Sequence, residues 1–327
     1  MAFGLWLLFT GGSAFLYKWI LHWITGIHIE NIMKHSRIET AQEVYALSGF
    51  LLTNQIIGFG LSTWVVSRAF GSYRQTLATW PATIPMMILA MGIAVAALPA
   101  VQTMILDADT FKLPKDLHTM EQLLEEAENR SDSVIRPMLE GFPVLSMMLI
   151  GILPAFAEEL FFRGLLLNML RRHLNVHFTV WLIGLIFSLV HGQVYGVFAR
   201  WLLGVMLGYL VVWSGSVWPA VAAHFSFNSF QVVLAHVVYS KPGHNIPAGE
   251  NYDLPFDLGL EAGILVALGL YLFYKLGISS RRKIEALKED VYQPPIFEDE
   301  PIDESHTADE NPEPADASAK PTAEDAE

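Results

Sequence analysis

Six charged or polar residues stand out because they lie in otherwise apolar stretches of the chain. They are Glu158, Glu159, Arg163, His191, His224 and Asn228. A charged side chain at the centre of a membrane-spanning helix costs roughly 2.5–3.5 kcal/mol on an insertion scale, so these residues need a reason to be there. As a set they could supply a general base, polarising donors and an oxyanion site, which amide hydrolysis requires.

The spacing of the three charges in the first group separates their roles. Glu159 and Arg163 are four residues apart, so in a helix they lie on one face and can form an ion pair. Glu158 points about 100° away and would stay free for chemistry or for a metal. The alternative is that all three charges mark the end of a membrane helix and extend to the interface.

The two His residues and Asn228 are interpreted together with Glu158, because each alone would indicate only a structural role. His191 alone would be a hydrogen-bonded packing residue, and His224 with Asn228 alone would be a pair that joins two membrane helices. One Glu and two His are, however, also the ligand set of a catalytic zinc site with an open position for water. Glu158, His191 and His224 are therefore candidate ligands for zinc or another divalent metal.

The composition indicates that membrane helices position these residues. Hydrophobic residues make up 53% of the 327 residues, charged residues 16%, and the mean hydropathy is +0.38. We predict an all-α, polytopic transmembrane helix bundle of about eight spans. The apolar runs lie at about 2–24, 44–66, 82–106, 142–172, 178–191, 195–213, 217–238 and 254–276. The first could instead be a signal peptide, but its first Lys comes only at position 18.

The predicted organisation has three parts. Residues 1–141 hold the N-terminal transmembrane helices and a polar loop, residues 142–278 the catalytic transmembrane core, and residues 279–327 a disordered acidic tail. In the loop, apolar residues recur at helical spacing between 117 and 127, which predicts an amphipathic helix on the membrane surface or a soluble helix packed on the loops. The net charge of −13 arises from residues 289–327, a segment rich in Pro, Ala, Asp and Glu.

Charge and cysteine usage exclude several classes of function. Because residues 1–288 carry no net charge, nothing indicates a nucleic-acid partner. The absence of Cys rules out disulfides, a thiolate nucleophile and Cys-based metal sites. The basic residues of three loops fall on one side in an eight-span count, which predicts that this side and both termini are cytoplasmic. These residues are Arg68, Arg74, Arg171, Arg172, Arg281, Arg282 and Lys283.

Three motifs occur in order on separate predicted spans. They are Glu158-Glu159-x-x-x-Arg163, Phe187-x-x-x-His191 and His224-x-x-x-Asn228. This order resembles the CPBP family, which comprises the CaaX proteases and the bacteriocin-processing enzymes and is also called the Abi family. The resemblance covers residues 142–238 well. It implies an intramembrane endopeptidase, placed in the bacterial cytoplasmic (inner) membrane, whose partners are the lipid bilayer and a prenylated or bacteriocin-like peptide or protein substrate.

The resemblance also implies a role for each residue. Glu158 would be the general base that activates water, with assistance from His191. His224 and Asn228 would stabilise the oxyanion, while Glu159 and Arg163 would orient the site. The family is often described as metalloproteases, yet the same residues support a metal-free glutamate mechanism; we expect metal-dependent activity.

Two other classes of function remain open at this point. A non-catalytic membrane protein that binds a peptide or confers immunity could use the same cluster without hydrolysis. A transporter could use intramembrane Glu and His residues as a proton relay, but the chain shows no inverted repeat. The His-Glu-x-x-His and Gly-x-Gly-Asp signals of other intramembrane proteases are absent.

Overall fold

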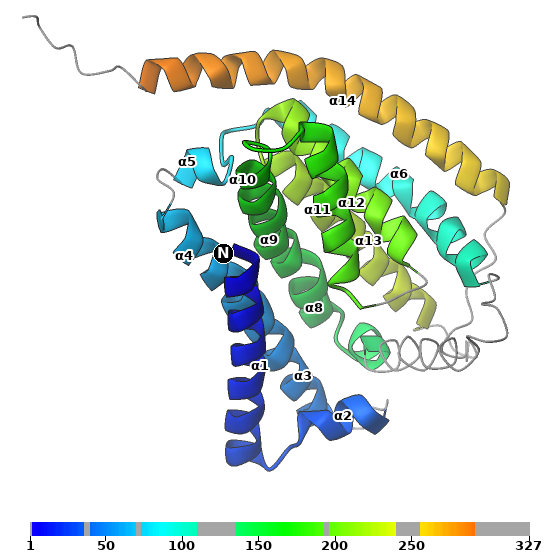
Figure 1. The fold of residues 1–327 in the computed structure, drawn as a ribbon. Coiled ribbons are helices and arrows are strands. Elements are labelled where there is room, and N and C mark those ends of the chain that lie inside the picture. Colours follow the sequence, from blue (N-terminus) through cyan, green and yellow to red (C-terminus); the bar gives the residue numbers. More distant parts are fainter. Residues whose placement is uncertain are drawn as a thin grey trace, which may run out of the picture. The chain divides into compact units, whose positions relative to one another are not determined.

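The protein is described here by a computed structural model, which covers residues 2–35, 40–69, 73–109, 135–192, 196–239 and 256–291. The regular elements in these ranges are all helices (Figure 1). The prediction of an all-α membrane bundle is therefore confirmed. The chain divides into two units, Met1–Ala286 and Leu287–Glu327, and the account below concerns the first.

Helical elements follow one another along the described part of the chain. The N-terminal elements are α1 (Ala2–Thr25), α2 (Ile29–His35), α3 (Ala41–Thr53), η1 (Asn54–Leu61), α4 (Ser62–Ala69), α5 (Tyr73–Thr76) and α6 (Ile84–Asp109). One continuous helix then comprises α8 (Pro143–Ser146), η3 (Met147–Ile152), α9 (Leu153–Glu159), η4 (Leu160–Leu167) and α10 (Asn168–Leu170). The last elements are α11 (Val176–Leu189), α12 (Val197–Ser214), α13 (Trp218–Tyr239) and α14 (Phe256–Val291). The η segments are π-helical, and such segments are frequent at functional sites.

Every predicted apolar run contains a helix, but not every helix has the length and hydropathy of a span. Among the described residues, five helices are long and apolar enough to cross a membrane: Ala41–Ala69, Ile84–Met104, Pro143–Leu170, Val197–Ser214 and Leu258–Ser279. Helix α11 is shorter, and α1 and α13 are long but carry several polar residues. The number of eight spans stays a prediction.

One predicted boundary differs from the structure. We expected the last span to end near residue 276 and the disordered tail to begin at 279, whereas α14 continues to Val291. Residues 279–291 include good helix formers, and the Nε of Arg281 pairs with the Oε1 of Glu285 at 3.0 Å, one turn away. The segments 110–134 and 292–327 lie outside the described residues. The amphipathic loop helix and the disorder of the rest of the tail therefore stay predictions.

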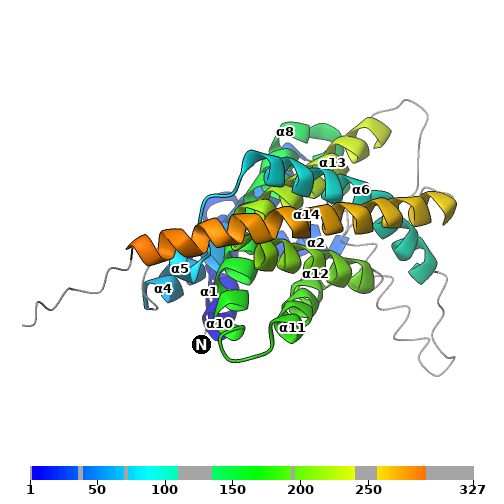
Figure 2. The ribbon, with the colours of Figure 1, turned by 90° about the horizontal axis from the view of Figure 1, so that it is seen from above.

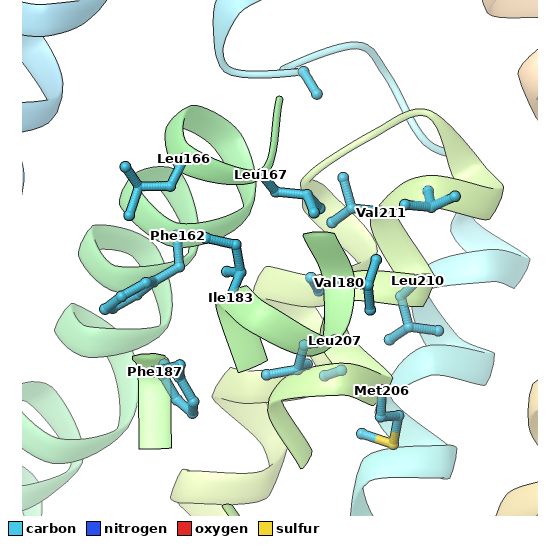
Figure 3. Packing of buried hydrophobic residues seen from close by; sticks show 14 of the residues in the cluster. Phe162, Leu166, Leu167, Val180, Ile183, Phe187, Met206, Leu207, Leu210 and Val211 are labelled. Atoms are coloured by element: carbon cyan, nitrogen blue, oxygen red, sulfur yellow. The ribbon is translucent and has the colours of Figure 1, made fainter. Parts of the chain in front are cut away.

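Close helix crossings build the core around the continuous helix Pro143–Leu170, which carries the first motif and is called the motif helix. An added Cβ on Gly204 of α12 would lie 2.9 Å from the Cα of Gly184 on α11, so glycine allows these helices to touch through their backbones. Buried side chains of η4, α11 and α12 interdigitate beside this crossing (Figure 3). Helix α14 lies along α6 and α12 in two views (Figures 1 and 2), and an added Cβ on Gly277 would lie 2.8 Å from the carbonyl oxygen of Trp213.

Candidate active site

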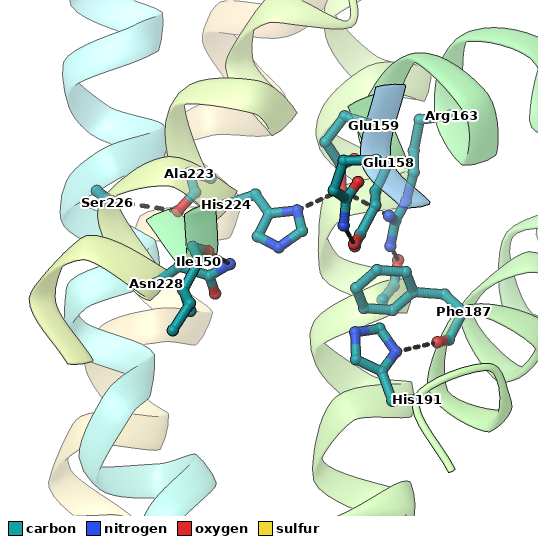
Figure 4. A network of polar contacts seen from close by, with 12 residues as sticks. Ile150, Glu158, Glu159, Arg163, Phe187, His191, Ala223, His224, Ser226 and Asn228 are labelled. Carbon is teal, nitrogen blue, oxygen red and sulfur yellow. Dashed lines mark hydrogen bonds and ion pairs between the residues drawn. The ribbon is translucent and has the colours of Figure 1, made fainter. Parts of the chain in front are cut away.

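A proline sets the local geometry of the motif helix. Because Pro154 has no N–H, the carbonyl of Ile150 lacks its usual α-helical donor. The Nδ2 of Asn228 on α13 donates a hydrogen bond to that carbonyl at 2.9 Å (Figure 4). Asn228 thus fastens α13 to the helix that carries Glu158 and Glu159, and it retains a second Nδ2 hydrogen for another acceptor.

Glu159 is the centre of a buried network. Its Oε1 accepts a hydrogen bond from the Nη1 of Arg163 at 2.6 Å and lies 2.8 Å from the Nδ1 of His224 (Figure 4). The Nη2 of Arg163 donates to the carbonyl of Gly204 at 3.1 Å, and its Cζ lies 4.3 Å from the ring centre of Phe187. Both charged side chains have no exposed surface, so each needs the other to offset the loss of hydration.

The contact with Glu159 orients His224. When Nδ1–H donates to the carboxylate, the ring orientation is set and Nε2 is left for other partners. The same arrangement of carboxylate and imidazole serves in many sites to fix the tautomer of a functional histidine. Glu159 therefore joins Arg163 on its own helix to His224 on α13.

Glu158 lies on the other side of the same helix turn and has different partners. Its side chain is 6% exposed, and Oε1 accepts a hydrogen bond from the Nε2 of Gln55 on η1 at 2.8 Å. Its Oε2 is buried and makes no hydrogen bond within the described part of the chain. A buried carboxylate oxygen that the fold leaves unsatisfied is a candidate for a functional contact.

His191 follows the end of α11. Its Nδ1 lies 2.7 Å from the carbonyl oxygen of Phe187, and its ring packs against the Phe187 ring with centroids 4.8 Å apart (Figure 4). Glu158 lies near enough to interact electrostatically with His191 and with Arg163. Neither His191 nor Asn228 is hydrogen-bonded to the other four motif residues.

The residues predicted as metal ligands do not fit a metal in this arrangement. No group of three or more His, Asp or Glu side chains within the described ranges is placed to hold a metal ion. The Nδ1 of His224 contacts Glu159 and the Nδ1 of His191 contacts a backbone carbonyl, so Nε2 is the nitrogen of each ring that is left for a ligand. Metal dependence stays a prediction.

Gln55 was missed by the sequence analysis. The signal was present, since Asn54 and Gln55 are adjacent amides within an apolar run, and polar groups inside membrane helices mark contacts with other helices. No spacing rule connects them to Glu158, however, because 103 residues separate the two partners.

One comparison with known proteins matches the middle of the chain. A family model described as type II CAAX prenyl endopeptidase Rce1-like matches residues 140–230. Searches of curated proteins and of solved structures found no significant match. The matched segment holds all six motif residues and excludes Gln55. The resemblance drawn from the three motifs is thus confirmed, because residues 140–230 of this integral membrane protein match the Rce1-like family model, which is consistent with the CPBP family of proteases.

Proposed function

We propose that the protein is an intramembrane endopeptidase that hydrolyses a peptide bond in a membrane-associated, prenylated or bacteriocin-like peptide. The observation that supports this most directly is the buried, unsatisfied Oε2 of Glu158. It lies beside a second carboxylate, Glu159, which is ion-paired with Arg163, in a segment that matches a protease family. We place the protein in a bacterial inner membrane with both termini in the cytoplasm.

Each motif residue has a chemical role in this proposal. A water molecule donates a hydrogen bond to Glu158, which takes its proton as the water oxygen bonds to the peptide carbonyl carbon. His191 assists through Nε2, because its Nδ1 is engaged with Phe187. When the C–N bond breaks, the proton passes from Glu158 to the leaving amine.

Two side chains face the negative charge that develops on the carbonyl oxygen. The second Nδ2 hydrogen of Asn228 is one donor. His224 is the other, and this role requires that the ring carry protons on both nitrogens, with Nδ1–H held by Glu159. Donors fixed in a site from which water is excluded stabilise such an oxyanion more than they would in bulk solvent.

A cleavage assay on matched variants tests the proposal. The purified full-length protein is reconstituted in proteoliposomes with an internally quenched, farnesylated peptide that ends in Cys-aliphatic-aliphatic-Met, and with the same peptide lacking the farnesyl group. Wild type is expected to cleave, and Glu158→Gln is expected to lose about 100-fold or more of kcat because it cannot accept the proton. Glu140→Gln is the control, because Glu140 is exposed and its Oε1 pairs with the Nε of Arg136, one helical turn away.

The outcomes separate the competing functions. Full activity in Glu158→Gln would overturn the role of Glu158. Tight binding of the peptide by wild type without any product would instead support the non-catalytic binding protein. Loss of activity in a chelator, with recovery in Zn²⁺, would mean that Glu158, His191 and His224 rearrange into the ligand set expected from the sequence.

A further inference from the structure

Gln55 connects the N-terminal part of the chain to the proposed base. It lies in η1, within the candidate span Ala41–Ala69, and its side chain is 8% exposed. Its Nε2 donates to the Oε1 of Glu158 at 2.8 Å. Since an ionised carboxylate only accepts hydrogen bonds, the amide must present its nitrogen, and its orientation follows from its partner.

The rest of the amide supports a role directed at Glu158. The Oε1 of Gln55 is buried and makes no hydrogen bond with the described residues. An amide that only joined helices would gain stability by satisfying its oxygen as well as its nitrogen. Among the described residues, the amide of Gln55 instead makes its side-chain hydrogen bond to the carboxylate of Glu158.

Glu158 in turn depends on that contact for its orientation. Arg163, the nearest cation on its own helix, gives its hydrogen bonds to Glu159 and to Gly204. Within the described ranges, Gln55 is the residue that donates to Glu158. A hydrogen bond on Oε1 restricts the rotation of the carboxylate and leaves Oε2 as the oxygen available to a proton donor.

We propose that Gln55 is a positioning residue for the reaction, which holds the Glu158 carboxylate in the orientation that accepts a proton from water. This inference rests on the proposed function. It means that the catalytic arrangement extends beyond residues 140–230, because a membrane helix from the first part of the chain completes it.

The first test is a kinetic comparison in the same proteoliposome assay with the farnesylated peptide. Gln55→Met keeps the length of the side chain but has no N–H donor. We expect kcat to fall about 10–100-fold, as for other residues that orient a catalytic group, while KM changes less than about twofold. Asn168→Leu is the matched control, because it removes another buried amide, which donates to the carbonyls of Gly164 and Thr76. It is expected to lower thermal stability and leave kcat unchanged.

The second test uses Gln55→Glu. When protonated, the new carboxyl can donate to Glu158 as the amide does; when ionised, it repels Glu158. Other ionisable groups in the described part of the site are Glu159 and Arg163 on the motif helix, His191 after α11, Arg200 on α12 and His224 on α13. All of them are the same in wild type. The ratio of variant to wild-type kcat is therefore expected to fall as the pH rises. A purely structural role for Gln55 would give no such trend.

Each result decides between defined alternatives. If Gln55→Met retains wild-type kcat while Glu158→Gln is inactive, the positioning role is overturned and the proposed function stands. If Gln55→Met does not fold, a flat pH ratio for Gln55→Glu overturns the positioning role in its place. If Glu158→Gln is fully active, the proposed function fails, and the inference fails with it.

Discussion

At the scale of single residues, one acidic pair is divided into two environments by side chains from elsewhere in the fold. The Oε1 of Glu159 pairs with the cation Arg163 and contacts His224, whereas the Oε1 of Glu158 accepts from the neutral amide of Gln55. The Oε2 of each carboxylate is buried without a hydrogen bond to the described residues. Neighbouring carboxylates with different partners are a common way to divide catalytic roles. The structure therefore supports Glu158, rather than Glu159, as the proposed base.

The buried ion pair makes a prediction about stability. Arg163→Met leaves Glu159 buried without its cation, so the free energy of unfolding should fall by about 3–5 kcal/mol. Adding Glu159→Gln to the same variant should recover part of this loss, because the uncompensated charge is removed. Unfolding by SDS titration in mixed micelles measures both effects.

A matched surface pair supplies the control for this experiment. Arg281 and Glu285 have the same spacing, but about half of each side chain is exposed. Arg281→Met should therefore change the unfolding free energy by less than about 1 kcal/mol. A similar loss for Arg163→Met and Arg281→Met would contradict the view that burial decides the contribution of the pair.

At the scale of elements, the crossing of α11 and α12 places a backbone acceptor in the site. The carbonyl of Gly204 accepts from Arg163, and the absence of a side chain at Gly184 and Gly204 brings the two helices close enough for this contact. The motif helix, α11 and α12 therefore meet at one charged side chain. Loss of the close crossing would disturb the site without changing any motif residue.

This crossing can be tested with a single methyl group. Gly204→Ala should destabilise the fold by about 1–3 kcal/mol, because the new Cβ would lie 2.9 Å from Gly184, which has no side chain that could yield. Gly92→Ala on α6 is the control, since nothing lies within 4 Å of its added Cβ. The control should gain up to about 1 kcal/mol from helix propensity. Thermal unfolding that ranks the two variants in the opposite order would rule out the tight crossing.

At the scale of the whole unit, basic residues distant in sequence gather at one end. Burial and the nearby Arg281 and Arg172 lower the pKa of Arg171 to about 10. The loop after α10 and the C-terminal part of α14 therefore lie together. The count of eight spans predicted that these two segments lie on the same side of the membrane. Their proximity agrees with that prediction.

The orientation of this end in the membrane is directly testable because the chain has no Cys. A single Cys can be introduced by His173→Cys beside the basic cluster or by Glu140→Cys, which lies just before the other end of the motif helix; both positions are exposed. If the basic end is cytoplasmic, a membrane-impermeant maleimide should label Glu140→Cys in intact cells and label His173→Cys only after lysis. The reverse pattern would place the basic end outside the cytoplasm.

The membrane bundle, the family and the Glu159–Arg163 pair follow from the sequence, because apolar runs, motif order and i,i+4 spacing depend only on local periodicity. Helical spacing could not decide which partners come from other helices. The contacts of Glu159 with His224 and of Glu158 with Gln55 span 65 and 103 residues, and they depend on how the helices cross. The tertiary structure alone therefore decided that His224 is the further partner of Glu159 and that Gln55 is the partner of Glu158.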